Sequence, residues 1–311
     1  MAVFTKPSGA ERGRYHRRLS ECGTIAIMDT PLKDANAPSA VRRFLFEGAD
    51  LRGEVVRVDS AFAAILQNHQ YAPGVRNLLG EFLAAAVLLA TTLKFQGRLT
   101  LQARSSGQVP LIMAECTSDL AVRAIARGAQ EATSLRFGEL LADGQLAITV
   151  EPDRGRRYQG IVPLRGDSLA ESLDAYFEQS EQLHARVWLA CDGSRATGLL
   201  LQQLPTQLTP DPLEREAQWT HACTLAATVS DGELLALEAD ELLYRLYHED
   251  PVRLFDPQPV RFRCSCSRER SRRALATLGE AEIRDILEEQ GSVTMDCEFC
   301  NQQYIFEAPE L

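Results

Sequence analysis

The sequence predicts an α+β protein with a large N-terminal domain of helices and β-sheet, a helical linker and a small cysteine-rich C-terminal domain. Three observations lead to this fold class. Short apolar segments typical of strands form one block of sequence, and strongly helical segments precede and follow it. The proline-rich segment "LPTQLTPDP" (204–212) then interrupts the periodic pattern. Two closely spaced cysteine pairs, "CSC" and "CEFC", lie near the C-terminal end.

Length and composition are those of a soluble globular protein. The chain of 311 residues has room for one large domain and a smaller one, and 45% of its residues are hydrophobic and 24% charged. Its net charge of −10 argues against general binding to nucleic acid, because that function favours a basic surface.

Residues 1–40 are polar and show no sustained periodicity, so we expect a disordered N-terminal extension. Basic residues occur there without an apolar core segment, which is not the pattern of a signal peptide. An organelle transit peptide and a true start of translation at Met28 are the alternatives, and the role of Cys22 stays open. We expect a cytoplasmic protein, and in that reducing compartment paired cysteines are more often metal ligands or redox sensors than structural disulfides.

The predicted core domain covers residues 41–205, and its first elements alternate between strand and helix. "RGEVVRV" (52–58) is typical of a strand, and the helix that follows is expected to begin with Ser60 as its N-cap. A long helix is expected over 74–94. Its apolar run over 82–93 is too short to cross a bilayer, so we expect a buried helix with an alanine-rich packing face.

Strands dominate the rest of this domain. Turn residues separate five predicted strands, at 98–104, 109–116, 120–127, 145–152 and 158–164. A helix with a serine cap is expected over 168–180. Two further strands are expected around the turn at Asp192-Gly193.

The predicted linker, residues 206–263, is rich in acidic side chains. Its leucines and alanines recur at helical spacing and predict one amphipathic helix containing Leu235, Ala239, Leu242, Leu243 and Leu246. A helix of this length depends on packing for its stability, and its like charges repel. The residues alone favour a docked helical connector over a conformational switch.

Residues 264–311 contain the strongest signal in the sequence. Thiolate sulfur is a preferred ligand of Zn²⁺, and Cys264, Cys266, Cys297 and Cys300 could complete a closed tetrahedral site. We therefore predict a C-terminal zinc-binding domain with one zinc ion per chain. A segment close to the limit of about 40 residues needs such support, and structural zinc contributes about 10–16 kcal/mol of apparent folding free energy.

The remaining cysteines and the histidines give no second site. Cys22, Cys116, Cys191 and Cys223 stand singly, and buried free thiols are expected where the surroundings are apolar. The histidines are dispersed and no phosphate-binding glycine loop occurs. We therefore expect a protein that is not an enzyme.

Zinc-bound thiolates are also targets for peroxide. A run of arginines beside the first cysteine pair would favour thiolate further; it comprises Arg261, Arg263, Arg268, Arg270, Arg272 and Arg273. A solvated helix start and a nucleic-acid patch are the alternative interpretations of this run. If oxidation removed the metal, the tail would unfold and the adjacent linker helix could lose its partner.

Several motifs carry a family resemblance. "RFRCSCSRER", "MDCEFCNQQYIF" and the preceding "LLYRLYHEDPVRLFDPQPV" resemble the 33 kDa chaperonin family of redox-regulated heat shock chaperones. "GEVVRVD", "NLLGEFLAAAVLLATTLKFQG" and "RYQGIVPL" resemble the N-terminal domain of that family. The similarity covers roughly residues 41–307.

The resemblance implies a reduced, zinc-bound protein that is inactive, with the four cysteines as zinc ligands. Oxidation would form the disulfides Cys264–Cys266 and Cys297–Cys300, release zinc and unfold the linker. The protein would then hold unfolded or partly folded client proteins without ATP, as a homodimer, with no nucleic-acid or membrane partner. Asn301 stands where relatives commonly carry glycine, and we expect it to accept the same left-handed conformation.

Two other functions use the same cysteines. A zinc-ribbon module that binds a protein or nucleic acid would need the metal for structure alone, and the net charge opposes the nucleic-acid version. A dithiol oxidoreductase would use the C-x-x-C pair, but it would have no need of a second cysteine pair.

Overall fold

The computed structural model describes residues 2–3, 38–180, 184–277 and 279–308. Most of the predicted N-terminal extension, including Met28 and Cys22, lies outside these residues. Within residues 1–40, Ala2–Val3 form the short strand β1, and β2 begins at Ala40. The prediction that residues 1–40 are disordered therefore stays a prediction.

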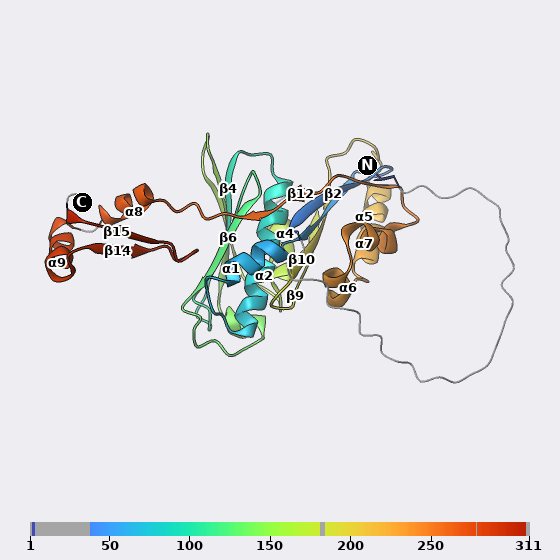
Figure 1. The fold of residues 1–311 in the computed structure, drawn as a ribbon. Helices are drawn as coiled ribbons and strands as arrows, with labels where there is room; N and C mark the ends of the chain where they lie inside the picture. The colour runs from blue at the N-terminus through green and yellow to red at the C-terminus, as the bar shows by residue number, and fades with distance from the viewer. Residues whose placement is uncertain (1, 4–37, 181–183, 278, 309–311) are drawn as a thin grey trace, which may run out of the picture.

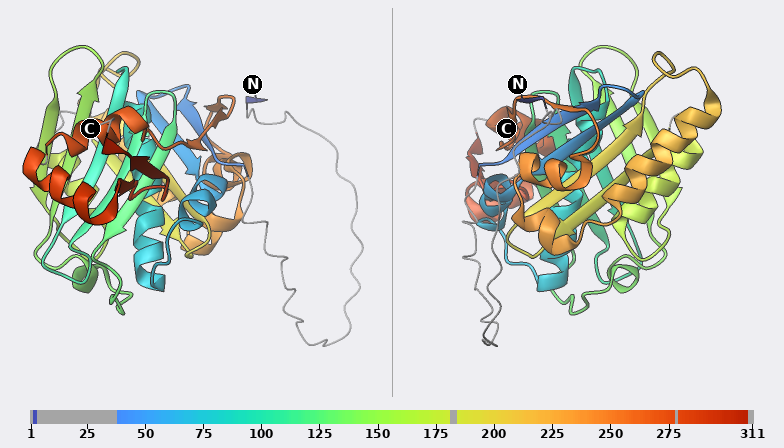
Figure 2. Two further views of the ribbon diagram at one scale, coloured as in Figure 1. Left: turned by 60° about the vertical axis from the view of Figure 1, so that its left-hand side comes forward. Right: turned by 90° about the vertical axis from the view of Figure 1, so that its right-hand side faces the viewer.

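Two β-sheets enclose the long helix α2 (Pro73–Thr92), and three linker helices cover the outer face of one sheet (Figure 1). The first sheet has the order β1, β11 (Val252–Leu254), β2 (Ala40–Phe46), β3 (Leu51–Arg57), β10 (Ala196–Gln203), β9 (Ala185–Cys191), with β12 (Gln258–Pro259) also paired to β2. The second has the order β13 (Arg261–Phe262), β6 (Ala121–Arg127), β5 (Leu111–Thr117), β4 (Gly97–Arg104), β7 (Gln145–Pro152), β8 (Tyr158–Pro163). Figure 2 shows the same layers from two other sides.

The main core lies between the two sheets. The small side chains Ala84, Ala85 and Ala86 of α2 are fully buried there, which lets both sheets approach the helix closely. Helices α1 (Asp59–Leu66) and α4 (Leu169–Ser180) close the sides, and the short α3 (Phe137–Leu140) packs near α2. By length and composition α2 could span a membrane, but it is mostly buried inside the protein. The prediction of a buried helix is confirmed.

The linker forms helices α5 (Pro212–Ala226), α6 (Asp231–Ala236) and α7 (Ala239–Tyr247). The prediction of one amphipathic helix through Leu235 and Leu246 is wrong. The chain is extended at Leu237 and Glu238, where ψ is 142° and 156°, so α6 ends and α7 begins anew. The buried leucines of both helices still pack against the first sheet.

A second apolar core results from this covering. On the sheet side it contains Phe44, Phe46, Leu199 and Leu201, all 6% exposed or less. On the linker side it contains Trp219, Leu234, Leu242, Leu243, Leu246 and Tyr247. The rings of Phe46 and Tyr247 meet edge to face with centroids 5.0 Å apart, and the Tyr247 hydroxyl donates to the Ala222 carbonyl.

After the linker the chain crosses from one sheet to the other. Strands β11 and β12 pair antiparallel with β2 in the first sheet. Strand β13 then pairs parallel with β6 at the edge of the second sheet, through bonds from the Arg261 and Arg263 amides to the Leu120 and Val122 carbonyls (3.0 and 3.1 Å). Cys264 therefore follows directly on a segment that is fastened to the core.

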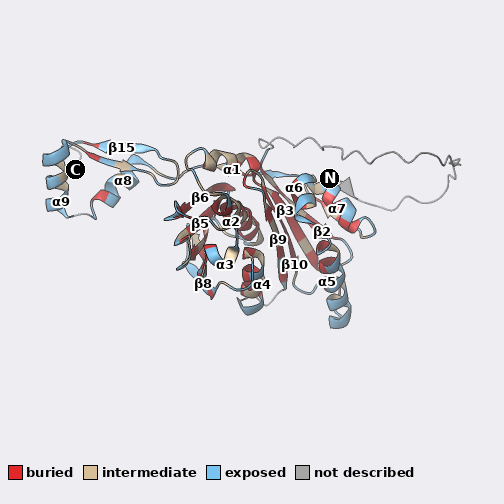
Figure 3. Cartoon of the chain, turned by 90° about the horizontal axis from the view of Figure 1, so that it is seen from below, coloured by how far each residue is buried: buried red, intermediate tan, exposed pale blue. Residues whose placement is uncertain are grey.

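The C-terminal segment folds as a small separate unit. It contains α8 (Arg268–Leu275), α9 (Glu280–Gln290) and the hairpin of β14 (Val293–Asp296) and β15 (Gln303–Phe306). Its buried core consists of Leu275, Val293 and Phe306. Most of its other residues are exposed, in contrast to the densely buried central layers (Figure 3).

The sequence predicted this α+β architecture, and the structure confirms it. The strand at 52–58, the five strands at 98–164 and the pair around Asp192-Gly193 are all present within a few residues. The expected serine cap of α4 is also present, because the Ser168 Oγ accepts a hydrogen bond from the Glu171 amide. Ser60 is not an N-cap: α1 begins at Asp59, and the Ser60 hydroxyl instead meets the Ser39 hydroxyl at 2.9 Å. The domain boundaries at 41–205, 206–263 and 264–311 stay predictions.

Candidate metal centre and its contacts with the core

Four sulfur atoms come together at the start of the C-terminal unit. The Sγ atoms of Cys264, Cys266, Cys297 and Cys300 all lie within 4.8 Å of one another. The shortest separations are 3.6 Å for Cys264–Cys297 and 3.5 Å for Cys266–Cys300. Zn–S bonds of about 2.3 Å in a tetrahedron place sulfurs about 3.8 Å apart, so this donor set fits a closed zinc site. The cluster could hold a metal ion, and the identity of that metal stays a prediction.

The second cysteine pair occupies the turn of the β14–β15 hairpin. The Cys297 carbonyl accepts from the amides of Cys300 (3.3 Å) and Asn301 (2.7 Å), and the Cys297 amide donates to the Gln302 carbonyl (2.9 Å). Asn301 has a φ of 53°, in the left-handed region that glycine and asparagine adopt most readily. The expectation that Asn301 keeps the turn in the place of glycine is confirmed.

Hydrogen bonds surround the sulfurs. Burial raises the pKa of Cys264, but bonds from the Cys266 backbone and from the neighbouring thiols outweigh it and hold this pKa below its usual value. Burial raises the pKa of Cys297 despite bonds from the backbone of Phe299 and Cys300. The Tyr304 hydroxyl donates to the sulfur of Cys266 at 3.2 Å. Donors of this kind stabilise negative charge on sulfur once a cation is bound.

Four arginines of the run beside the first pair lie in α8, as in the helix-start interpretation, whereas Arg261 lies in β13 and Arg263 follows it. Ser267 caps this helix by accepting from the Arg270 amide at 3.2 Å. The Arg270 side chain donates to the carbonyl and hydroxyl of Ser265, at 2.7 and 2.9 Å. Arg268 donates to the Ile305 carbonyl and lies over the Phe306 ring, 4.6 Å from its centroid. These arginines hold the cysteine loop against the hairpin.

The metal centre lies against the second sheet and the turn after α1. On strand β6, Arg123 reaches the Cys264 sulfur at 3.8 Å and lies 4.0 Å from the centre of the Phe299 ring. Nearby, Arg127 pairs with Glu298, and the Asn301 amide donates to the Asn68 carbonyl. These core residues were missed from the sequence, because nothing local in strand β6 marks a side chain that will meet a cysteine far along the chain.

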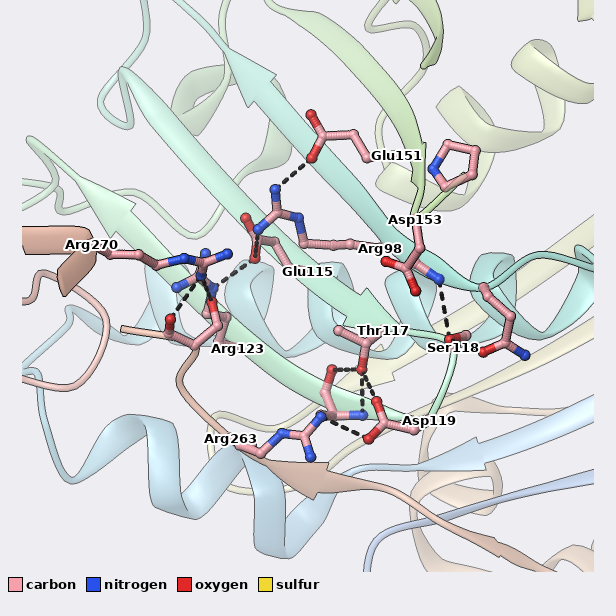
Figure 4. Close-up of a pocket in the computed structure, with 15 residues that line it drawn as sticks. Arg98, Glu115, Thr117, Ser118, Asp119, Arg123, Glu151, Asp153, Arg263 and Arg270 are labelled. Carbon is pink, nitrogen blue, oxygen red and sulfur yellow. Dashed lines mark hydrogen bonds and ion pairs between the residues drawn. The ribbon is translucent and has the colours of Figure 1, made fainter. Parts of the chain in front are cut away.

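A polar cavity of about 540 Å³ lies beside this contact (Figure 4). It opens between the outer face of the second sheet and the segment that leads into the metal centre. Its walls carry both signs of charge, contributed by Arg98, Glu115, Asp119, Arg123, Glu151, Asp153, Arg263 and Arg270. Arg263 closes one end by pairing with Asp119 at 2.7 Å.

The other cysteines in the described part of the chain do not join the centre. Cys116 and Cys223 are buried and Cys191 is partly buried, each without a disulfide, as expected for free thiols. Burial raises the pKa of all three to about 12.

Two core residues hold the linker. Asp50 accepts from the amides of Gln207, Leu208 and Thr209 and pairs with Arg215 at 2.9 Å, which fixes the start of the linker. Arg57 on β3 holds the break between α6 and α7, by donating to main-chain carbonyls there. Polar contacts therefore attach the linker at its start and at the break between α6 and α7.

Comparisons with known proteins agree with the family resemblance predicted from the sequence motifs. A family model described as Hsp33 protein matches residues 39–307. Relatives named 33 kDa chaperonin occur in Pseudomonas paraeruginosa strain PA7 (55% identical) and Pseudomonas aeruginosa strain UCBPP-PA14 (54%), each match covering 87% of this chain and 92% of the relative. The relative of that name in Azotobacter vinelandii is 52% identical with the same coverage. These names describe chaperones and agree with the expectation of a non-enzymatic protein.

A solved structure gives the same result for the fold. The 33 kDa chaperonin (heat shock protein 33 homolog) of Thermotoga maritima superposes with a TM-score of 0.73, covering 87% of this chain and 96% of that chain. The two sequences are 21% identical, so this likeness concerns the fold alone.

Proposed function

Because the chain belongs to the Hsp33 protein family and is a chaperone of that family, we propose that it is a redox-regulated, ATP-independent holdase. In this proposal the reduced, metal-bound protein is inactive, and oxidation of the cysteine centre activates it. The observation that carries the proposal is the gathering of four sulfurs within 4.8 Å in a small unit whose chain continues directly from the linker.

Zinc is the metal that this donor set favours, with Cys264, Cys266, Cys297 and Cys300 as its ligands. When bound, zinc keeps the sulfurs as thiolates and ties the two halves of the tail together. Among the described residues of the tail, the buried apolar core consists of Leu275, Val293 and Phe306 with a few partly buried neighbours, so the metal would supply most of the stability of the tail.

Oxidation would form Cys264–Cys266 and Cys297–Cys300. Support for this pairing comes from the family and from the short loops that it closes. Each such loop stabilises the fold by only about 2 kcal/mol, less than the metal that it replaces. The tail would therefore lose its structure.

Strands β11, β12 and β13 join the linker to the tail, so loss of the tail would loosen the linker through this segment, and release of the linker would uncover apolar surface. The outer face of the first sheet carries Phe44, Phe46, Leu199 and Leu201 beneath the linker helices. A contiguous apolar face of this kind is a surface to which unfolded or partly folded client proteins could bind. The leucines of α6 and α7 would be uncovered at the same time.

The remaining parts of the proposal follow from the family. The chain would act in the cytoplasm, with client proteins as its partners, and would form a homodimer when oxidised. It needs neither a nucleic acid nor a membrane as a partner. The net charge of −10 is compatible with this choice.

Light scattering from a thermally unfolding client protein tests the proposal. Zinc-loaded reduced protein is compared with protein treated with peroxide at mild heat, and released zinc is measured with a chromogenic chelator. We expect suppression of aggregation only after oxidation, in step with zinc release. Equal activity of both forms, or none in either, would leave the structural zinc-ribbon function as the better explanation.

A further inference from the structure

A row of alternating charges crosses the second sheet and ends at the cysteine centre. Arg123 on β6 pairs with Glu115 on β5 at 2.6 Å, and Glu115 also meets Arg98 on β4 at 3.6 Å. Arg98 pairs with Glu151 on β7 at 2.5 Å. Figure 4 shows these side chains projecting from neighbouring strands on one face. Beyond Arg123, the next atom in the row is the Cys264 sulfur at 3.8 Å.

Because the row is buried, the stability of its charges depends on the charge of the group at its end, the Cys264 sulfur. The Arg123 and Glu115 side chains are 13% and 8% exposed, so their charges are largely removed from water. Glu115 is shared between two guanidinium groups, Arg123 and Arg98. One carboxylate therefore faces two cations, and the cation next to the tail is stabilised by any further negative charge on its open side. That side faces Cys264 and the Phe299 ring.

The charge of the cysteine centre depends on its redox state. Four thiolates around one divalent zinc ion carry a net charge of about −2. Oxidation by peroxide converts four thiolates to two disulfides and transfers four electrons to two peroxide molecules. With four protons these become four water molecules, and the zinc ion leaves. The sulfurs that faced Arg123 are then neutral.

We propose that Arg123 is the positioning residue through which the core recognises the loaded cysteine centre by its negative charge. It holds the tail against β6 while the centre is anionic and releases the tail when oxidation makes the centre neutral. This inference rests on the proposed function and adds an electrostatic release to the loss of metal-dependent folding. Strand β13 transmits that release, because its two residues pair with β6 immediately before Cys264.

Neighbouring contacts supply a matched control. Arg127 lies on the same strand and pairs with Glu298, whose carboxylate charge does not change on oxidation. Removal of either arginine takes one cation from the strand; Arg127→Gln removes its pair with Glu298, and Arg123→Gln removes its contacts with the Cys264 sulfur and the Phe299 ring. Of these two arginines, Arg123 alone faces a group whose charge depends on redox state. The two substitutions therefore separate recognition of the centre from general docking of the tail.

The experiment uses the full chain with Arg123→Gln, Arg123→Lys, Glu115→Gln and Arg127→Gln. Hydrogen exchange of the Arg261 and Arg263 amides measures docking, since they donate to the carbonyls of Leu120, just before β6, and of Val122 in β6. Cobalt loading and its thiolate charge-transfer band show whether the four-sulfur site is intact. For Arg123→Gln we expect at least a tenfold loss of amide protection with an unchanged cobalt spectrum, and partial recovery with lysine.

Glu115→Gln distinguishes charge recognition from a structural role and gives a readout if Arg123→Gln fails to fold. It removes the anion that competes for Arg123, so we expect protection in the loaded protein to stay equal or to rise. Moving from low to high salt should lower protection in the wild type and in Arg123→Gln, which keep the exposed Arg127–Glu298 and Arg263–Asp119 pairs, and should lower it less in Arg127→Gln. If Arg123→Gln keeps wild-type protection, or if Glu115→Gln loosens the tail as much as Arg123→Gln does, the inference is wrong.

Client aggregation is measured on the same samples. If wild-type protein suppresses aggregation equally in both redox states, the proposed function fails whatever Arg123 does. If redox control is present and Arg123→Gln docks normally, only the role of Arg123 fails.

Discussion

Arg57 donates from its guanidinium to the main-chain carbonyl of Leu237 at 2.8 Å, and this bond joins a core strand to the linker. A second bond reaches the Leu235 carbonyl at 3.2 Å, and the Glu238 carboxylate lies 3.3 Å away. These are the residues where α6 ends and α7 begins. The break in the helix therefore presents free carbonyl groups that an arginine of the sheet can bind.

Arg57→Gln should loosen the linker without disturbing the metal centre. The Arg57 side chain is 11% exposed, so the loss of its charged bonds should cost about 1–3 kcal/mol. We expect zinc-loaded, reduced protein to bind a hydrophobic dye more strongly and to exchange the amides of 231–247 faster. Arg245→Gln is the control, because Arg245 forms an exposed pair with Glu233 within the linker, at 3.2 Å. If dye binding and exchange match the wild type, Arg57 does not hold the linker.

Leu243→Ala tests the apolar part of the same interface. Leu243 is 1% exposed in the core between α7 and the first sheet, and such truncations cost about 2–5 kcal/mol. Urea unfolding should show this loss in the transition that reports on the linker. Leu213→Ala is the matched control: Leu213 is 82% exposed on α5 and its truncation should change stability by less than about 0.5 kcal/mol. Similar effects of both substitutions would contradict the packing of α7 on the sheet.

Glu81 should make stability fall as pH rises. Burial and the nearby Asp231 of α6 raise its pKa to about 7 in the folded protein. Because the folded pKa is raised, the protonated carboxyl stabilises the fold fully below about pH 4.5, and this stability is lost as pH rises through about 7.

Glu81→Gln keeps the shape of the side chain and removes its charge. We expect it to increase the free energy of unfolding by about 1–3 kcal/mol at pH 8 and to change little at pH 4. Urea titrations at the two pH values measure the difference. An equal effect at both would mean that ionisation of Glu81 does not limit stability.

Removal of zinc should unfold the tail and leave the two-sheet core folded. Zinc-loaded protein treated with a strong chelator under reducing conditions should lose exchange protection over β14 and β15, while α2 stays protected. Cys297→Ser should reproduce this effect, because it removes one ligand. Cys116→Ala, in the main core, should leave zinc content at one ion per chain. Retained protection in the metal-free tail would show that its apolar residues suffice.

Asn301 separates the shape of the cysteine turn from its contact with the core. Its φ of 53° suits glycine but opposes a β-branched residue, so Asn301→Val should cost about 1–2 kcal/mol and weaken zinc binding in competition with a chelator. Asn301→Gly should keep zinc affinity while losing the side-chain bond to the Asn68 carbonyl. Equal zinc affinity of both variants would show that the turn does not need this conformation.

Patterns within a segment were the part of the fold that the sequence could predict. Alternating residues predicted the strands, and the alanine-rich period predicted α2, since burial determines both patterns. The helices of the linker were harder to predict. Leu235 and Leu242 keep a helical spacing across the break at Leu237, so the period alone could not show that the helix ends there.

Contacts between residues far apart in the chain could not be predicted from the sequence. The cysteine spacing predicted a four-sulfur cluster, because chelation needs only those side chains. By contrast, Arg57 meets a carbonyl 180 residues away, and Arg123 meets a sulfur 141 residues away. Each of these arginines lies in a segment whose alternating pattern already accounts for the strand. Nothing further in that pattern indicates which distant residue the arginine contacts.

The three cysteines outside the tail in the described part of the chain, two buried and one partly buried, leave the four tail cysteines as its oxidant-sensitive thiols. With pKa values of about 12, Cys116, Cys191 and Cys223 exist as thiolates in only about one molecule in 100,000 at neutral pH. In the folded protein, peroxide therefore reacts with the tail cysteines in preference to these three. Among the seven cysteines of the described part of the chain, a cellular dithiol reductant would then need to reset only the four of the tail. The response would then be repeatable, with the same stoichiometry in every cycle.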